Sequence, residues 1–252
     1  MKNYQFGTFQ FPAAYLKRGL VTLRGRIFNK KNNAYKKPLF RKKEPPDIAE
    51  LLERTHFETV MAFSEALEAR DQYTAGHSRR VMEYSQDIGQ RMKLDRQDIE
   101  QLKKSALLHD IGKIGIPDIV LHKQTKLTDE EYAIIKSHAE IGATILKYIK
   151  SFKNLVPAVY HHHERFDGKG YPQGIKGEAI PLHARIIAIA DTFDAMTSNR
   201  AYRKALSFKT ALSALEQNKN MQFDPCIADV FIEILQESPY YFTLFREPEY
   251  HL

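Results

Sequence analysis

The residues of this chain best suited to chemistry are histidines that lie beside carboxylates. Residues 161–172, HHHERFDGKGYP, place three imidazoles and two carboxylates next to a glycine-rich turn. A second pair, His109-Asp110, lies upstream inside an apolar segment, where charged groups need partners. Imidazole together with carboxylate suits iron, manganese or zinc. A single histidine cluster would also fit a solvated surface tract, but two such segments together predict a metal centre.

The candidate ligands fall on the apolar faces of predicted helices. His109 continues the stripe of Ile99, Leu102 and Ala106 at helical spacing, so we expect its side chain to point inward. Three other positions share this pattern: His138 among Ile134, Ile135, Ile141 and Ile145; His162 after Leu155 and Val159; and Asp191 after Ile187 and one turn before Asp194. One such residue alone would fit a hydrogen-bonded core side chain. Several on successive helices are tolerated together when they share a cation.

The elements that carry these residues are predicted to be helices. From Asp47 onward the apolar spacing is helical almost throughout, without the long alternating pattern of a β-strand. Three stripes have this spacing: Ile48, Leu51, Leu52, Phe57, Val60, Met61, Phe63 and Leu67; Val81, Tyr84, Ile88 and Met92; and Ile99, Leu102, Ala106 and His109. Polar residues, Gly and Pro predict loops at residues 125–129, 151–154 and 167–181. The expected fold class is an all-α bundle with a loop-rich insert after the histidines.

The N-terminal part of the chain differs from the rest in charge. Residues 1–50 hold 12 Lys and Arg against 3 Asp and Glu, whereas residues 51–252 hold 26 against 28. We expect a basic segment and linker over residues 1–46 and a helical domain over residues 47–252, with Asp47 as the first N-cap. The segment would suit a solvated tail, a docking arm for an acidic partner or an anionic membrane surface, and nucleic-acid binding is not indicated.

Composition also bounds the environment of the protein. Apolar residues make up 43% of the chain, as in ordinary soluble proteins, and no apolar run is long enough to span a membrane. The N-terminus lacks the pattern of a secretory signal. The single cysteine, Cys226, is expected to be a small buried side chain. These features predict a cytoplasmic protein without a transmembrane span.

Longer motifs resemble the HD-GYP branch of the HD phosphohydrolases. They are LLHDIGKIGIPD at residues 107–118 and HHExxDGxGYP at residues 162–172. Shorter matching segments are Arg70-Asp71 with Thr74 and His77, Leu127-Thr128 with Glu130, His138, Ile180-Pro181, residues 184–186 and 190–195, Arg200 with Tyr202-Arg203, and residues 223–225. The resemblance implies an HD-domain helical bundle with a GYP insert. It also implies a phosphodiesterase that hydrolyses the bacterial second messenger cyclic di-GMP to pGpG or onward to GMP.

The same resemblance implies a centre of two divalent metal ions. The first ion would take His77, His109, Asp110 and Asp191, and the second would take Asp110 as a bridge with His138, His162 and His163. Some family members bind a third ion through a Glu at the position that Tyr73 occupies here. A neutral Tyr is a poor metal ligand, so we expect two ions in this chain. The ligands suit iron or manganese, with zinc or nickel as alternatives. Hydrolysis would use a hydroxide activated between the two ions.

Further residues are implied in catalysis and in substrate binding. Asp110 and Lys113 are the expected catalytic residues, with the ammonium of Lys113 near the nonbridging phosphate oxygens. The expected substrate-binding residues are Asp71, Lys113, Tyr171, Arg200 and Arg203. Tyr171 would either shape the substrate cavity or recruit a diguanylate cyclase partner, and ordinary loop packing fits it equally well. Glu164 and Asp167 are expected to fix the loop rather than to bind metal.

Two other functions fit the same residues. An HD hydrolase of another cyclic nucleotide, such as cyclic GMP-AMP, would need the same metals, because metals alone do not select guanine. A catalytically inactive receptor for cyclic di-GMP would signal by contact through Tyr171 or the basic segment. The complete set of ligands argues against the receptor, because a lost His or Asp is the expected trace of lost catalysis.

Overall fold

The secondary structure of the chain is helical wherever the structure describes it. The computed structural model describes residues 47–70, 76–199, 204–238 and 241, which belong to one compact unit, Pro46–Leu252. Within these residues there is no β-strand, and one isolated bridge joins Lys219 and Phe223. None of the described helices is long and apolar enough to cross a bilayer. The all-α fold class is confirmed, whereas the basic segment predicted over residues 1–46 lies outside the described residues.

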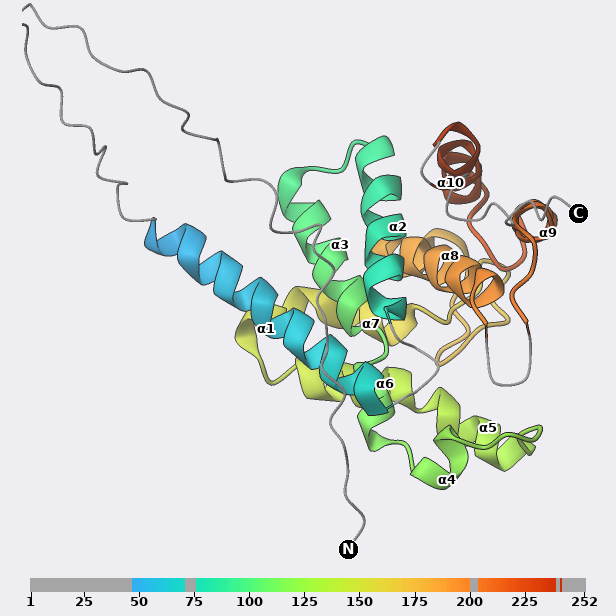
Figure 1. Cartoon of the computed structure of the whole chain (residues 1–252), viewed down its shortest axis with the longest axis horizontal. Coiled ribbons are helices and arrows are strands. Elements are labelled where there is room, and N and C mark those ends of the chain that lie inside the picture. The colour runs from blue at the N-terminus through green and yellow to red at the C-terminus, as the bar shows by residue number, and fades with distance from the viewer. Residues whose placement is uncertain (1–46, 71–75, 200–203, 239–240, 242–252) are drawn as a thin grey trace, which may run out of the picture. The chain divides into compact units, whose positions relative to one another are not determined.

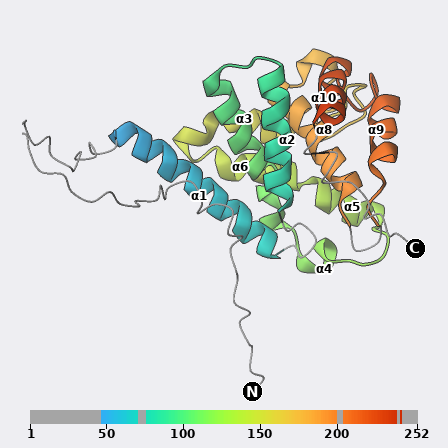
Figure 2. The ribbon, with the colours of Figure 1, turned by 45° about the horizontal axis from the view of Figure 1, so that its top comes forward.

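Helices of very different length follow one another along the chain. The α-helices are α1 Ile48–Arg70, α2 His77–Arg91, α3 Arg96–Leu108, α4 Asp118–Leu121, α5 Asp129–Lys136, α6 His138–Leu146, α7 Val156–His161, α8 Leu182–Thr197, α9 Phe208–Gln217 and α10 Pro225–Glu237. Short 3-10 helices lie at η2 Ile111–Gly115, η3 Lys150–Leu155 and η4 Gly177–Ala179. α2 packs against α3, α8 and α10, and α9 lies beside α10 at the end of the bundle away from α1 (Figures 1 and 2).

The long helix α1 is buried along only part of its length. The predicted N-cap is confirmed, because the N–H of Ala49 donates to Asp47 Oδ1 at 3.1 Å. Val60 and Leu67 face inward, toward α3 and η2. The rest of the predicted apolar stripe is partly wrong, because these residues are exposed: Ile48, Leu51, Leu52 and Phe63. The first turns of α1 extend beyond the helices against which its second half packs (Figures 1 and 2).

One apolar core lies between α2, α3, α8, α9 and α10. Its centre is an aromatic cluster in which the Tyr84 ring lies 5.4 Å from those of Phe193 and Tyr241 and 5.7 Å from that of Phe231. Edge-to-face and tilted contacts at these separations are favourable for aromatic rings. The expected burial of Val81, Tyr84 and Ile88 is confirmed.

The prediction of a buried cysteine is wrong. Asp224 caps α10 by accepting hydrogen bonds from the N–H groups of Cys226 and Ile227. In this first turn Ile227 and Ala228 face the core, so Cys226 is left on the exposed side of the helix.

A second core supports the histidine-bearing turns. It is formed by α1, α3, η2, α6, η3 and α7 through these residues: Val60, Leu107, Leu108, Ile111, Leu146, Phe152, Leu155 and Val159. The loop predicted at residues 151–154 is wrong, because this segment forms η3 and buries Phe152 in the core.

The segment around His138 forms two helices rather than one. α5 is fixed at its start by a capping box, in which the Thr128 hydroxyl accepts from the N–H of Glu131 and the Glu131 carboxylate accepts from the N–H of Thr128. α5 ends at Lys136, and α6 begins at His138. The predicted inward face is therefore wrong for α5, which buries none of its residues and leaves Ile134 exposed.

The turn that follows Asp110 lies unusually close to α6. A Cβ atom at Gly112 would be 1.8 Å from the carbonyl oxygen of His138 and 2.5 Å from the nitrogen of Gly142. Only glycine fits at this position, because backbone atoms cannot give way as a flexible side chain can. This contact brings the backbone of Asp110 close to that of His138.

We expect Gly112→Ala to lower the free energy of unfolding by about 3 kcal/mol or more, because the added methyl group overlaps the backbone of α6. Urea unfolding followed by circular dichroism measures the change. Gly177→Ala is the control, since a Cβ atom added there would have nothing within 4 Å and its φ of 60° costs about 1–2 kcal/mol. Equal losses in the two variants would contradict this account of Gly112.

Candidate metal centre

All seven residues predicted to bind metal lie together. They form two groups of side chains: His77, His109 and Asp191; and Asp110, His138, His162 and His163. Within each group the potential ligand atoms lie within 4.8 Å of one another. This histidine and aspartate cluster has the composition and spacing to hold metal ions.

Helix ends deliver most of the imidazoles to the cluster. His77 is the first residue of α2 and His138 the first of α6, while His109 and His162 directly follow α3 and α7. Asp191 differs, because it lies within α8. Convergence of helix ends lets several polar side chains share one small volume while the helices themselves diverge into the apolar cores.

A buried carboxylate from α1 fixes the start of α2. Glu68 accepts hydrogen bonds from the N–H of Gly76 at 2.6 Å and the N–H of Ser78 at 2.7 Å. These are amide groups that the helix itself cannot satisfy, and a negative charge is favourable at this end. Gly76 has a φ of 70°, which suits glycine. The orientation of His77 is therefore set by α1 as well as by α2.

The Asp110 carboxylate lies between the two groups. Its Oδ2 is 3.5 Å from Nε2 of His109 and 3.8 Å from Nε2 of His77, whereas its Oδ1 is 3.5 Å from Nε2 of His138. Lys113 also reaches it, with Nζ 2.7 Å from Oδ2. Burial by itself raises the pKa of Asp110, but Lys113 and the three imidazoles outweigh it and lower this pKa well below its usual value. The carboxylate is therefore ionised and faces both groups.

In four of the five imidazoles of the cluster, the other ring nitrogen is already hydrogen-bonded. Nδ1 of His109, His138 and His162 lies 2.7 Å from a backbone carbonyl oxygen three residues earlier. Nδ1 of His77 lies 2.7 Å from Oδ2 of Asp194. A carbonyl or carboxylate oxygen can only accept, so each Nδ1 donates its proton. In a neutral ring, Nε2 then carries a lone pair that points into the cluster.

These lone pairs face one another at short range. Nε2 of His77 is 3.3 Å from that of His109, and Nε2 of His138 is 3.3 Å from that of His162. Two lone pairs at this distance repel unless positive charge lies between them. Burial lowers the pKa of His162 well below its usual value, and burial with the nearby His138 lowers that of His163 to about 3, which disfavours a proton there. The donor set therefore fits a bound cation.

Two charged side chains, Asp194 and Arg80, support His77 on the side of its ring that faces away from the cluster. Asp194 is buried and accepts from His77 Nδ1, while Arg80 donates to the same carboxylate through Nε at 2.5 Å and through its terminal nitrogen at 3.1 Å. Burial lowers the pKa of His77, but its hydrogen bond to Asp194 and the charges of Asp191 and Asp110 outweigh burial and raise it. Such a partner fixes the ring orientation and increases the basicity of the facing nitrogen.

The glycine-rich loop folds back over the second group. A Cβ at Gly170 would lie 2.3 Å from the nitrogen of Arg165 and 2.6 Å from the carbonyl oxygen of His163, so the loop can pass there only as glycine. The N–H of Tyr171 donates to that same carbonyl at 3.2 Å. The Tyr171 ring lies 4.8 Å from the His163 ring at an interplanar angle of 31°. Tyr171 therefore forms a wall beside the histidines.

The two carboxylates of the loop stabilise it from within. Glu164 is buried, and its Oε1 accepts from the N–H groups of Gln173 and Gly174 at 2.7 and 3.1 Å. Asp167 accepts from Arg165 and from the N–H of Lys169. Both hold the loop, and neither belongs to the two groups of potential ligands.

Some predicted site residues cannot be placed. Asp71, Tyr73, Arg200 and Arg203 lie outside the described residues, so their roles stay predictions. His161, the first histidine of the triple run, is not among the grouped ligands, and its Nδ1 lies 3.7 Å from Oε1 of Glu164.

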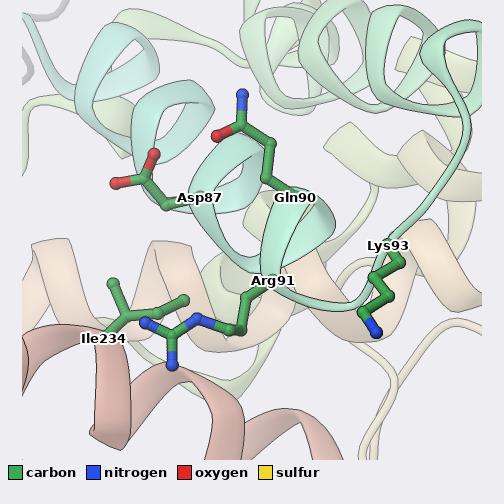
Figure 3. A pocket seen from close by; sticks show the side chains of 5 residues that line it. All are labelled: Asp87, Gln90, Arg91, Lys93 and Ile234. Atoms are coloured by element: carbon green, nitrogen blue, oxygen red, sulfur yellow. The ribbon is translucent and has the colours of Figure 1, made fainter.

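A separate hollow lies on another part of the surface, between α2 and α10. It has a volume of about 440 Å³ and is lined by Asp87, Gln90, Arg91, Lys93 and Ile234 (Figure 3). Arg91 crosses to α10, where its guanidinium pairs with Glu237 at 2.6 Å. None of these residues belongs to the histidine cluster, so the hollow is not part of the candidate site.

Comparison with known proteins identifies the family. The sequence pattern described as "HD domain" matches residues 61–227. The chain belongs to the HD-domain family. This match confirms the resemblance inferred from the His109-Asp110 pair and the later motifs.

This HD domain is similar in sequence to proteins that are named as phosphodiesterases. It is 40% identical over 187 residues to the 3'3'-cGAMP-specific phosphodiesterase 3 of Vibrio cholerae, an alignment that covers 73% of this chain and 41% of that protein. It is 38% identical over 183 residues to the cyclic di-GMP phosphodiesterase response regulator RpfG of Xanthomonas campestris, covering 72% of this chain and 48% of that protein. The HD-domain chain thus spans less than half the length of these two curated relatives.

A solved structure shares the fold of this HD domain. The crystal structure of a cyclic GMP-AMP-specific phosphodiesterase from V. cholerae superposes with a TM-score of 0.59 at 22% identity, over 76% of this chain and 51% of that chain. At this identity the likeness establishes the fold alone, and it agrees with the predicted HD-domain bundle.

Some contacts that support the histidine cluster were not predicted from the sequence. They are the contact of Asp194 with His77 and that of Arg80 with Asp194, although Arg80 lies one helical turn after His77 and Asp194 one turn after Asp191. That spacing is a usable signal, because residues three apart share a helix face. Glu68 lacks such a signal, since its partners lie in the next helix.

We expect Asp194→Asn to weaken the affinity of the HD domain for Mn²⁺ about 10- to 100-fold, because His77 loses its anionic partner. Titration with Mn²⁺ against a competing chelator measures the affinity. Glu237→Gln is the matched control, since Glu237 also pairs with an arginine, Arg91, but its side chain is exposed at the end of α10. Wild-type affinity in Asp194→Asn would contradict the role given to Asp194.

Proposed function

We propose that this chain is a metal-dependent phosphodiesterase that hydrolyses cyclic di-GMP to pGpG or onward to GMP. The observation that carries the proposal is the pair of facing Nε2 contacts, each 3.3 Å long, on either side of the Asp110 carboxylate. The name of the X. campestris relative supports the same substrate.

The proposed ligands divide between two divalent ions. His77, His109 and Asp191 would hold one, and the second would be held by His138, His162 and His163, with Asp110 offering one oxygen to each side. When bound, two such ions supply Lewis acidity for phosphodiester hydrolysis. Imidazole-rich sites with carboxylates suit iron or manganese, and zinc or nickel would also bind.

Residues of the chain itself would orient the phosphate. Lys113, with Nζ 2.7 Å from Asp110 Oδ2, is close enough to the cluster for its ammonium to contact a nonbridging oxygen and to offset developing negative charge there. The Tyr171 ring beside His163 would limit the cavity on one side. Asp71, Arg200 and Arg203 complete the proposed substrate contacts on the basis of the family resemblance.

A second substrate has a specific observation in its favour. The V. cholerae relative, at 40% identity, is named as specific for 3'3'-cGAMP, so cyclic GMP-AMP is the alternative substrate for the same groups. The two messengers differ in one base, and the ligands to metal do not contact bases. Selection between them would fall to residues outside the cluster.

A protein partner and the location in the cell are also proposals. The tip of the glycine-rich loop, Pro172 to Gly174, is exposed and is the surface on which a diguanylate cyclase partner would bind. The cytoplasmic location stays a prediction from the sequence.

Anaerobic hydrolysis tests the proposal directly. Full-length protein reconstituted with Fe²⁺ or Mn²⁺ is incubated with cyclic di-GMP and, separately, with cyclic GMP-AMP, and the products are separated by chromatography. We expect pGpG or GMP to form and a chelator to stop the reaction. Absence of turnover on both messengers, despite bound metal, would overturn the proposed activity.

We expect Asp110→Ala to lower both metal content and kcat for the preferred messenger. The loss of kcat should exceed the roughly 10- to 100-fold that is typical when a residue hydrogen-bonded to a metal ligand is removed. Elemental analysis of the same sample gives metal per chain. Asp118→Ala is the control, because its carboxylate pairs with Arg70 at 2.6 Å on the surface and should leave both quantities unchanged. Full turnover in Asp110→Ala would exclude the bridging role.

A further inference from the structure

Two residues of α5 extend the wall of the site beyond Tyr171. Lys136 Nζ lies 5.8 Å from the centre of the Tyr171 ring and 5.1 Å from that of Tyr132. Tyr171 in turn lies against His163. A continuous row therefore runs outward from the histidine cluster to the surface, through side chains from two distant parts of the chain.

The helix that carries Tyr132 and Lys136 is held at both ends. α5 is fixed by its capping box, and Lys123 Nζ lies 2.5 Å from Oε2 of Glu131 in the first turn. At its other end α5 passes through one residue, Ser137, into the helix that begins with His138. The positions of Tyr132 and Lys136 are therefore tied to the position of a potential metal ligand.

The chemistry of this row is not that of a core. Tyr132 is 47% exposed, although the Lys136 ammonium lies over its ring. Within the described part of the chain, Lys136 has aromatic rings beside its ammonium and no carboxylate within ion-pair distance. An exposed ring next to an available ammonium is the combination that binds a nucleobase by stacking and a phosphate by charge.

We propose that Tyr132 and Lys136 form an outer subsite for the cyclic dinucleotide. Tyr132 stacks on one purine, and Lys136 pairs with the phosphate that is not hydrolysed. This inference rests on the proposed phosphodiesterase function and adds to it the residues that select a dinucleotide over a smaller phosphodiester. A substrate bound at the cluster would extend along the row that runs from His163 through Tyr171 and Lys136 to Tyr132.

Two substrates of different size test the outer subsite in the full-length, Mn²⁺-loaded protein. Cyclic di-GMP reaches Tyr132, whereas bis(p-nitrophenyl) phosphate offers one phosphodiester without a purine or a second phosphate. We expect Tyr132→Ala to raise KM for cyclic di-GMP about 5- to 100-fold, the range for loss of one stacked base. Lys136→Ala should also raise this KM, because the unhydrolysed phosphate loses its charged partner. Metal content and kcat/KM for bis(p-nitrophenyl) phosphate should stay at wild-type values.

The chain offers matched controls. Lys147 Nζ lies 5.3 Å from the Tyr148 ring at the far end of α6, so Tyr148→Ala and Lys147→Ala remove a similar pair away from the site and should leave both KM values unchanged. Tyr132→Phe keeps the ring and Lys136→Arg keeps the charge, so both should retain a KM near that of the wild type. Recovery in these conservative variants distinguishes substrate contact from a general loss of folding.

Binding without turnover separates this inference from the proposed activity. Equilibrium dialysis with a phosphorothioate analogue of cyclic di-GMP gives dissociation constants that should rise by the same factor as KM. Unchanged constants in Tyr132→Ala and Lys136→Ala would overturn the outer subsite even if the wild type hydrolyses cyclic di-GMP. Weaker binding in both variants would support it even if the wild type proved inactive, which would count against the proposed activity alone. An equal loss on bis(p-nitrophenyl) phosphate would place their effect at the cluster and overturn the outer subsite.

Discussion

The repulsion between buried imidazole lone pairs is the constraint on which the rest of this structure depends. Three backbone carbonyls and Asp194 each accept a hydrogen bond from Nδ1 of one ring. In neutral rings, four Nε2 atoms therefore meet as acceptors in pairs only 3.3 Å apart. The arrangement costs free energy unless positive charge lies between the rings. Folding and ligand binding are therefore coupled at this point, as in other sites whose ligands must be brought together.

Much of the fold serves to hold that arrangement. Glu68 fixes the start of α2 by accepting from Gly76 and Ser78, and the absence of a side chain at Gly112 lets η2 approach α6. Gly170 does the same for the glycine-rich loop over His163. Together these contacts hold α2, η2, α6 and the glycine-rich loop in place around the cluster.

The same contacts explain what could be predicted from the sequence. The all-α fold and the meeting of seven candidate ligand residues could be predicted, because helical spacing and motif carry that information locally. The break at Ser137 could not, since no Pro or Gly marks it and α5 is stabilised by its own capping box. Likewise, the contact of Asp194 with His77 depends on how α8 packs against α2, and the approach of Lys136 to Tyr171 depends on the path of the loop. Exposure of Cys226 and of the first turns of α1 is also set by packing rather than by residue type.

An X-ray anomalous difference map of crystals grown with Mn²⁺ tests the central claim most directly. The account predicts peaks in two places, one among His77, His109 and Asp191 and one among His138, His162 and His163, with Asp110 between them. Absence of any peak in these two places, with the facing imidazoles still paired in a metal-free cluster, would contradict it.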